Sequence, residues 1–161
     1  MRENIYQNIN LPISLSDKDA FKNFLGEVQE VKAFDDINFV TDRYVVAKAS
    51  GRLYRIGKRK LKTAEVEFLA NYIGRGANVA SDVRGGEQLD DSYKFVYQES
   101  KGYRYRINIS ALQNENGQGI KLNMRAISTD IPTLEYVGLS QEEFEMIFNG
   151  PGLVVLSGET G

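Results

Sequence analysis

Three consecutive segments in the second half of the chain alternate apolar and polar residues, and this alternation restricts the fold more than any other feature. A period of two residues is that of a β-strand, whose successive side chains point to opposite faces. Short polar connections at 99–102 and 114–119 suit tight reversals. We therefore expect an antiparallel meander with one buried and one polar face. The apolar positions are Tyr93, Phe95 and Tyr97, then Tyr103, Tyr105, Ile107, Ile109 and Ala111, and finally Ile120, Leu122, Met124 and Ala126.

The residues before the meander predict helices that alternate with short strands. Apolar residues at i, i+3, i+4 and i+7 mark one face of a helix, and capping residues and glycines mark its ends. Helices packed beside an antiparallel sheet define an α+β fold. The expected elements are a helix that follows Ser16 and is lined by Phe21, Phe24, Leu25 and Val28, a strand at 37–39, a hairpin over 44–56, a helix capped by Thr63 and ended by Gly74, and a short helix at 77–83.

A second unit is expected after the meander. Turn-forming residues and a proline at 128–139 predict a linker. Ser140 and Glu143 have the spacing of a capping box and predict a helix, which the Asn-Gly-Pro-Gly sequence at 149–152 ends. The run Leu153–Leu156 is apolar on both faces, which is typical of a strand inside a parallel sheet. We therefore divide the chain into an N-terminal domain at 1–127, a linker at 128–139 and the start of a second domain at 140–161.

The final ten residues join this apolar run to a glycine-spaced loop, Ser-Gly-Glu-Thr-Gly, at 157–161. A strand that runs into such a loop is how a phosphate-binding P-loop begins, and the full pattern G-x-x-x-x-G-K-[ST] adds a Lys for the phosphates and a hydroxyl for Mg²⁺. Gly158 and Gly161 fit the opening, while the Lys and hydroxyl residue are not in the sequence. A buried strand with a polar tail is the alternative, and these residues alone leave both open.

Several classes of chemistry are excluded by residue content. The chain contains neither Cys nor His, which excludes disulfides, zinc sites built on thiolates or imidazoles, and Cys or Ser–His nucleophilic catalysis. The neighbouring acids at 35–36 and 90–91 come just before predicted strands, so we assign them turn roles. Adjacent residues of a strand point to opposite sides, so we expect no shared metal site. The first ten residues are too polar for a signal peptide, and no run of about 18 apolar residues occurs, so a cytoplasmic protein is expected.

The charge is uneven along the chain. Lys and Arg number 20 and Asp and Glu 22, for a net charge of −2, yet the segment 51–62 holds six basic residues and no acid. Such a segment could meet nucleic acid or anionic lipid. A solvated hairpin followed by the start of a helix explains the same residues. We infer no strong nucleic-acid signal from it.

The polar face of the meander is the most suggestive part of the sequence chemically. If the hairpin turn centres on 116–117, Arg106 faces Ile127 and Asn108 faces Arg125, so that Arg106 and Arg125 become diagonal neighbours roughly 7–8 Å apart. Like charges gathered on one face favour a bound anion, and guanidinium groups suit phosphate oxygens. Pairing with Asp or Glu from a covering element is the alternative. The polar positions are Arg104, Arg106, Asn108 and Ser110 on one strand and Lys121, Asn123 and Arg125 on the next.

An ordered set of motifs resembles the first half of a secretion ATPase over roughly residues 35–161. The similarity is to the PilT/DotB-like superfamily, which contains the type IV pilus retraction motors and the type II and type IV secretion ATPases. The motifs are Asp36-Ile-Asn-Phe, Ala49-Ser-Gly-Arg-Leu-Tyr-Arg, Tyr103-Arg-Tyr-Arg-Ile-Asn, Met124-Arg-Ala-Ile, Ile131-Pro-Thr-Leu-Glu-Tyr-Val-Gly-Leu and the Gly152–Gly161 segment.

This resemblance implies a PAS-like N-terminal α+β domain with an antiparallel sheet and flanking helices, followed by the first helix and strand of a RecA-like α/β motor domain. It implies a hexamer that works with secretion or pilus proteins at the inner membrane. It also implies ATP and Mg²⁺ bound between the two domains. In such motors arginines of the N-terminal domain approach the phosphates, and the matching positions are Arg106 and Arg125, the pair that the hairpin face also selects.

These motifs and the resemblance together assign candidate roles to individual residues. Arg106 and Arg125 are the candidate catalytic residues, and the candidate cofactor-binding residues are Arg104, Gly158, Glu159, Thr160 and Gly161. The Walker A lysine and the Walker B carboxylate are not in the sequence, so we expect no ATP hydrolysis by this chain alone. The expected function is to supply arginines to ATP and to couple hydrolysis to domain motion. A non-enzymatic PAS-like binding or adaptor module for an anionic ligand is the alternative.

Overall fold

A mixed set of helices and strands forms two units, residues 1–127 and 128–161, in the computed structural model. The structure describes residues 4–6, 9–114, 117–128, 132–155 and 157–158. The elements of the first unit are β1 (Asn4–Tyr6), α1 (Lys18–Val31), β2 (Asp36–Val40), β3 (Tyr44–Ala49), β4 (Arg52–Lys60), α2 (Thr63–Ile73), α3 (Val79–Arg84), β5 (Leu89–Tyr97), β6 (Lys101–Asn114) and β7 (Gly117–Ile127).

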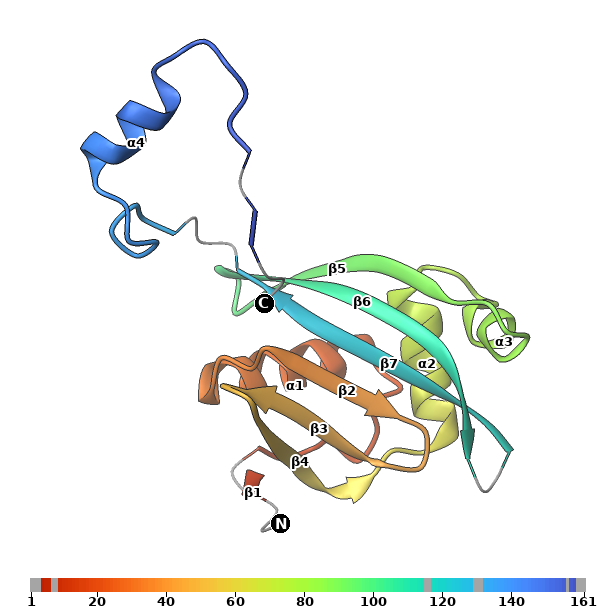
Figure 1. Cartoon of the computed structure of the whole chain (residues 1–161). Helices are drawn as coiled ribbons and strands as arrows, with labels where there is room; N and C mark the ends of the chain where they lie inside the picture. The colour runs from red at the N-terminus through yellow and green to blue at the C-terminus, as the bar shows by residue number, and fades with distance from the viewer. Residues whose placement is uncertain (1–3, 7–8, 115–116, 129–131, 156, 159–161) are drawn as a thin grey trace. The chain divides into compact units, whose positions relative to one another are not determined.

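One sheet with the strand order β1-β4-β3-β2-β7-β6-β5 organises the first unit (Figure 1). Six of these strands pair antiparallel, and the short β1 adds to β4 in parallel. The central pairing of β2 with β7 joins the N-terminal hairpin to the predicted meander. The expected α+β fold with an antiparallel sheet and flanking helices is therefore confirmed.

Two helices cover one face of this sheet. Figure 1 shows α1 and α2 on the same side of the strands. Their expected apolar stripes are buried, as is most of the apolar face of the meander. In the meander, Tyr93, Tyr97, Tyr103 and Ala126 are only partly buried against the core, and Ala111 lies exposed near the end of β6. The buried residues from the three groups are Phe21, Phe24, Leu25 and Val28, then Val66, Leu69, Ala70 and Ile73, and finally Phe95, Tyr105, Ile107, Ile109, Ile120, Leu122 and Met124.

Both N-terminal caps differ from the prediction by one residue. Asp17 rather than Ser16 caps α1, and its carboxylate accepts hydrogen bonds from the backbone N–H groups of Asp19 and Ala20. Lys62 rather than Thr63 occupies the N-cap of α2, where its backbone N–H donates to Glu65 Oε2 at 2.8 Å. A carboxylate is a better acceptor than a hydroxyl for the unpaired N–H groups of a first turn, which explains the shift at α1.

The register of the β6–β7 hairpin also differs from the expected one. Asn114 pairs with Gly117 at the closed end, so the turn lies one residue earlier in the chain than the expected centre at 116–117. Moving the turn by one residue moves every cross-strand partner by two. Arg106 consequently lies directly opposite Arg125, rather than diagonal to it, and Asn108 lies opposite Asn123. Gly117 has a φ of 110°, which favours glycine at this position.

The second unit contains the helix α4 (Gln141–Phe148). Ser140 and Glu143 form the expected capping box, and Asn149 follows the last helical residue. The structure assigns no strand to residues 153–155, where one was expected, and Leu156 lies outside the described residues. A strand requires a paired neighbour for its backbone groups, and these residues have none in the described part of the chain. Among the described residues, no helix has the length and apolar character needed to cross a membrane.

Candidate functional site

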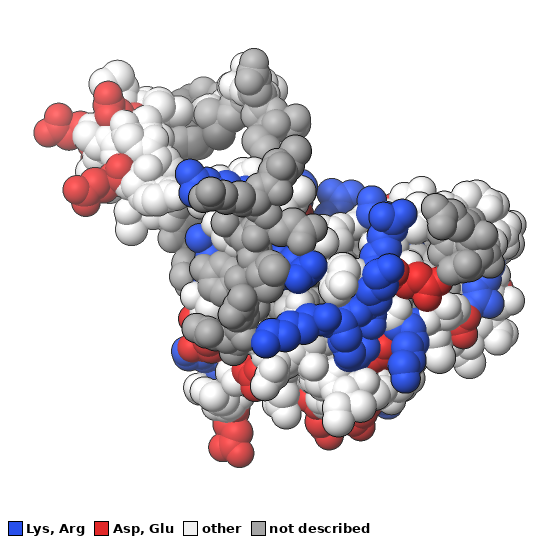
Figure 2. Space-filling view, turned by 90° about the horizontal axis from the view of Figure 1, so that it is seen from below, with Lys and Arg blue, Asp and Glu red and all other residues white. Residues whose placement is uncertain are grey.

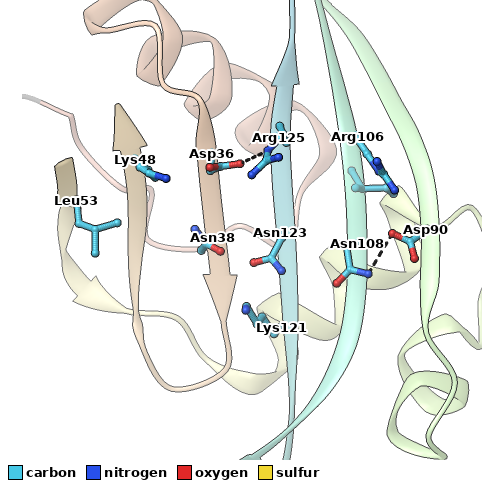
Figure 3. A pocket seen from close by; sticks show the side chains of 11 residues that line it. Asp36, Asn38, Lys48, Leu53, Asp90, Arg106, Asn108, Lys121, Asn123 and Arg125 are labelled. Carbon is cyan, nitrogen blue, oxygen red and sulfur yellow. Dashed lines mark hydrogen bonds and ion pairs between the residues drawn. The ribbon is translucent and has the colours of Figure 1, made fainter. Parts of the chain in front are cut away.

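The face of the sheet opposite α1 and α2, here called the open face, carries a shallow pocket of about 430 Å³. Polar side chains from five strands line most of it (Figure 3). These side chains alternate along each strand with the buried residues of the core, so the sheet pleat alone places them here. The lining residues are Asp36, Asn38, Lys48, Leu53, Asp90, Arg106, Ile107, Asn108, Lys121, Asn123 and Arg125.

Four charged side chains form a row across the open face, which we call the charged row: Lys48, Asp36, Arg125 and Arg106. Each is the direct cross-strand partner of the next, on β3, β2, β7 and β6. Figure 3 shows them side by side along the edge of the pocket. Three cations thus share one carboxylate within the row.

Arg125 is held by that carboxylate. Its Nε donates to Asp36 Oδ1 at 2.8 Å. The hydrogen bond to Asp36, and then its negative charge, raise the pKa of Arg125 above its ordinary value. The alternative expectation of an acidic partner is therefore met for this arginine, although the acid comes from the adjacent strand rather than from a covering element. The Nε contact leaves the two terminal nitrogens of the guanidinium for another partner.

Arg106 has a different environment. Its side chain is exposed, and within the described residues it forms no hydrogen bond or ion pair. Directly opposite residues in an antiparallel pair have Cα atoms about 4.5–5.5 Å apart, so Arg106 and Arg125 place two positive groups side by side. Like charges in such positions are destabilising. The pair therefore offers an anion two guanidinium groups at one place.

A second row of polar groups, here called the amide row, runs parallel to the first. Asn38, Asn123 and Asn108 are successive cross-strand partners, and Asp90 on β5 ends the row. Asn108 Nδ2 donates to Asp90 Oδ1 at 3.2 Å. The Oδ1 atom of Asn123 is buried and has no hydrogen-bond partner in the described part of the chain. Two residues along a strand span about 7 Å, so the amide row lies within reach of a ligand that contacts the arginines.

Of the other predicted site residues, the structure describes Arg104 and Gly158. Arg104 is exposed on β6 opposite Ile127 and Lys94, and it does not line the pocket. Gly158 is exposed in the second unit. The remaining candidates, Glu159, Thr160 and Gly161, lie outside the described residues.

The sequence prediction of the site did not include two pocket-lining residues of β2, Asp36 and Asn38. Asp36 and Asn38 alternate with the buried Ile37 and Phe39, so their shared face is readable from the sequence. Their position beside β7 is not readable, because it depends on a pairing between distant segments. Figure 2 shows Lys and Arg side chains gathered on one face, with some Asp and Glu side chains between them.

Part of the basic segment at 51–62 makes internal contacts. The Arg55 guanidinium lies over the Tyr44 ring, 4.4 Å from its centroid. Arg59 donates to both carboxylate oxygens of the buried Glu65, at 2.8 and 2.7 Å. Burial by itself would raise the pKa of Glu65, but the hydrogen bonds from Arg59 and from backbone N–H groups lower it overall. Within the described ranges, no group of three or more acidic side chains could hold a metal ion.

Comparison with solved structures identifies what this fold resembles. No protein-family model matches the sequence, and no curated protein matches it. The structure of the ATPase DotB from Legionella pneumophila matches with a TM-score of 0.76 and 29% sequence identity, over 90% of this chain and 38% of that one. The chain matches the N-terminal part of a secretion ATPase.

Two further structures support this match at the level of the fold. DotB from Yersinia pseudotuberculosis has a TM-score of 0.73 at 21% identity, over 88% of this chain and 39% of that one. The pilus retraction motor PilT, in a structure with bound ADP, has a TM-score of 0.52 at 16% identity, over 76% of this chain and 34% of that one. The resemblance to the PilT/DotB-like ATPases is confirmed. The chain spans less than two fifths of the length of these relatives.

Proposed function

We propose that this chain is the N-terminal part of a secretion, conjugation or pilus ATPase whose open face presents Arg106 and Arg125 to the phosphates of ATP. The observation that carries the proposal is the direct pairing of these two arginines at an open pocket, with one carboxylate between three cations. Guanidinium groups bind phosphate oxygens in a planar, bidentate manner. Two adjacent guanidinium groups therefore match the charge and shape of an oligophosphate.

In this proposal residues 1–127 are a PAS-like domain, 128–139 a linker and 140–161 the start of a RecA-like motor domain. The glycine-spaced loop, with Gly158 and residues 159–161, opens the phosphate-binding P-loop of that motor. ATP with Mg²⁺ is bound between the two domains. An arginine delivered by a mobile domain stabilises charge on the transferred phosphoryl group and makes hydrolysis conditional on closure. This dependence couples hydrolysis to domain motion.

The match to DotB and PilT also supports a setting for the protein. We propose a cytoplasmic homo-hexamer that is attached peripherally to the inner membrane through secretion or pilus proteins. The bound ADP in the PilT structure supports a nucleotide as the ligand. In this proposal the open face of each subunit binds the nucleotide, and it does not bind a membrane or a nucleic acid.

The decisive experiment measures ATP hydrolysis by the longer protein that extends this chain through a whole motor domain. Arg106→Ala and Arg125→Ala should each lower kcat by about 10²-fold or more while the variants still assemble. Arg52→Ala is the matched control, because Arg52 is an exposed arginine on β4 that does not line the pocket. Unchanged turnover in assembled Arg106 and Arg125 variants would refute the proposal.

A second candidate is a non-enzymatic PAS-like adaptor that binds an anionic ligand. It is favoured by the fact that the whole pocket lies within the first unit. The same experiment separates the two functions. An adaptor would bind an anion through Arg106 and Arg125, but the substitutions would leave turnover by the longer protein unchanged.

A further inference from the structure

Asp36 is the one acidic side chain of the charged row, and it contacts Arg125 through a single nitrogen. The contact joins Nε of Arg125 to Oδ1 of Asp36 at 2.8 Å. The Asp36 side chain is 20% exposed and that of Arg125 65% exposed, so the carboxylate lies near the sheet surface and the guanidinium extends from it. An arginine held at Nε keeps its end-on pair of terminal nitrogens free.

The other acids near the row are engaged elsewhere. Asp35 Oδ2 accepts from the backbone N–H of Ser50 at 3.1 Å. Asp90 accepts from Asn108 at 3.2 Å and from Gln88 at 3.3 Å. Arg125 therefore depends on Asp36 for its orientation.

Repulsion from Arg106 makes that orientation important. Two guanidinium groups on directly opposite residues tend to move apart, and an exposed arginine has many rotamers to which it can move. Binding an anion between them then costs the entropy of gathering both side chains. A carboxylate that fixes Nε of one arginine removes part of this cost before the ligand arrives, because the terminal nitrogens stay near the partner arginine.

We propose that Asp36 is a positioning residue of this site, which holds Arg125 by Nε so that its terminal nitrogens face an oligophosphate together with Arg106. This inference rests on the proposed function, since it assumes that the arginine pair binds phosphates. It makes a prediction opposite to that of simple electrostatics. Removing a negative charge near an anion site should strengthen anion binding, whereas removing a positioning group should weaken it.

Titration calorimetry of this chain with inorganic tripolyphosphate tests the inference. Asp36→Ala removes both the charge and the acceptor, and we expect it to weaken binding by about threefold or more. Asp36→Asn keeps an oxygen that can accept from Nε and should bind at least as tightly as the wild type. Asp90→Ala removes the same charge from the same pocket without touching Arg125, and it should tighten binding by up to about twofold.

The outcomes separate this inference from the proposed function. If Arg106→Ala and Arg125→Ala bind tripolyphosphate as well as the wild type, or if the wild type itself does not bind it, the phosphate site is refuted. If those variants lose binding but Asp36→Ala tightens it like Asp90→Ala, Asp36 is only an opposing charge and this inference alone is wrong.

A measurement on the wild type covers the case in which Asp36→Ala does not fold. The side-chain Nε–H signal of Arg125, assigned by its loss in Arg125→Lys, can be followed by NMR during the titration. We expect it to remain protected from solvent exchange at saturation, because Asp36 keeps its hydrogen bond while the terminal nitrogens bind phosphate. Loss of that protection on saturation would show that the anion displaces Asp36 and would overturn the inference.

Discussion

Arg106 on β6 and Arg125 on β7 are direct cross-strand partners, and both line the pocket on the face of the sheet opposite α1 and α2. Asp36 balances Arg125 on its other side, whereas Arg106 has no such partner among the described residues. The charged row therefore carries a net positive charge. Such an arrangement favours ligand binding at some cost in stability.

Because of this net positive charge, we expect a substitution of Arg106 to increase stability and to weaken anion binding. Arg106→Gln should raise the unfolding temperature by about 1–2 °C, because it removes a like-charge contact, and should weaken tripolyphosphate binding. The gain should be larger at low salt, where repulsion is less screened. Thermal unfolding at two salt concentrations checks this, with Arg52→Gln as the control for an exposed arginine outside the row. A lower unfolding temperature for Arg106→Gln would contradict the picture of repulsion.

The buried ion pair between Arg59 and Glu65 predicts a large stability effect. The Glu65 side chain is 3% exposed and accepts from Arg59 and from the backbone N–H groups of Leu15 and Lys62. Glu65→Gln should lower the free energy of unfolding by about 2 kcal/mol or more, because one partner of a buried pair remains uncompensated. Urea unfolding at pH 7 measures this. Glu30→Gln, at an exposed pair with Lys101, should change little.

The same pair predicts how stability changes with pH. The pKa of folded Glu65 lies below its ordinary value of 4.5. Its contribution is therefore complete above that value and is lost as the pH falls through the lower folded pKa. The difference in unfolding free energy between wild type and Glu65→Gln should shrink below pH 4.5. A difference that stays constant down to pH 3 would show that the charge of Glu65 does not contribute.

Gly26 on α1 packs against Tyr97 too closely to admit a methyl group. A Cβ atom at this position would overlap the Tyr97 ring on β5. Gly26→Ala should lower the free energy of unfolding by about 1–3 kcal/mol, even though alanine favours helices. Gly102→Ala is the control, because no atom lies within 4 Å of a Cβ there. Equal stability of the two variants would mean that α1 moves away from β5 without cost.

The internal contacts of the basic segment predict weak nucleic-acid binding. Arg55 lies over Tyr44 and Arg59 pairs with Glu65, which leaves fewer cations of the segment 51–62 for phosphates. We expect oligonucleotides to bind this chain no more tightly than about 10⁻⁵ M at physiological salt, the range of non-specific contacts. Fluorescence anisotropy measures this, with Lys58→Ala and Lys60→Ala as tests. Tight binding lost in both variants would favour a nucleic-acid interface instead.

The sequence alone determined which residues share a face. The alternation of polar and apolar residues placed Arg106 and Arg125 together opposite the core, and the motif order indicated the secretion ATPases before any fold was known. A shift of two residues leaves that alternation unchanged, so the faces were right although the expected register was wrong. For the same reason the distance between the two arginines could not be fixed by pattern.

Only the tertiary structure decided what surrounds the arginine pair. Asp36 reaches Arg125 because β2 pairs with β7 across 89 residues of chain, and no local propensity encodes such a pairing. Residues 153–155 formed no strand because a strand exists only with a paired neighbour, however apolar its sequence. Local pattern determined faces and periods, and long-range pairing determined register, neighbours and the pocket.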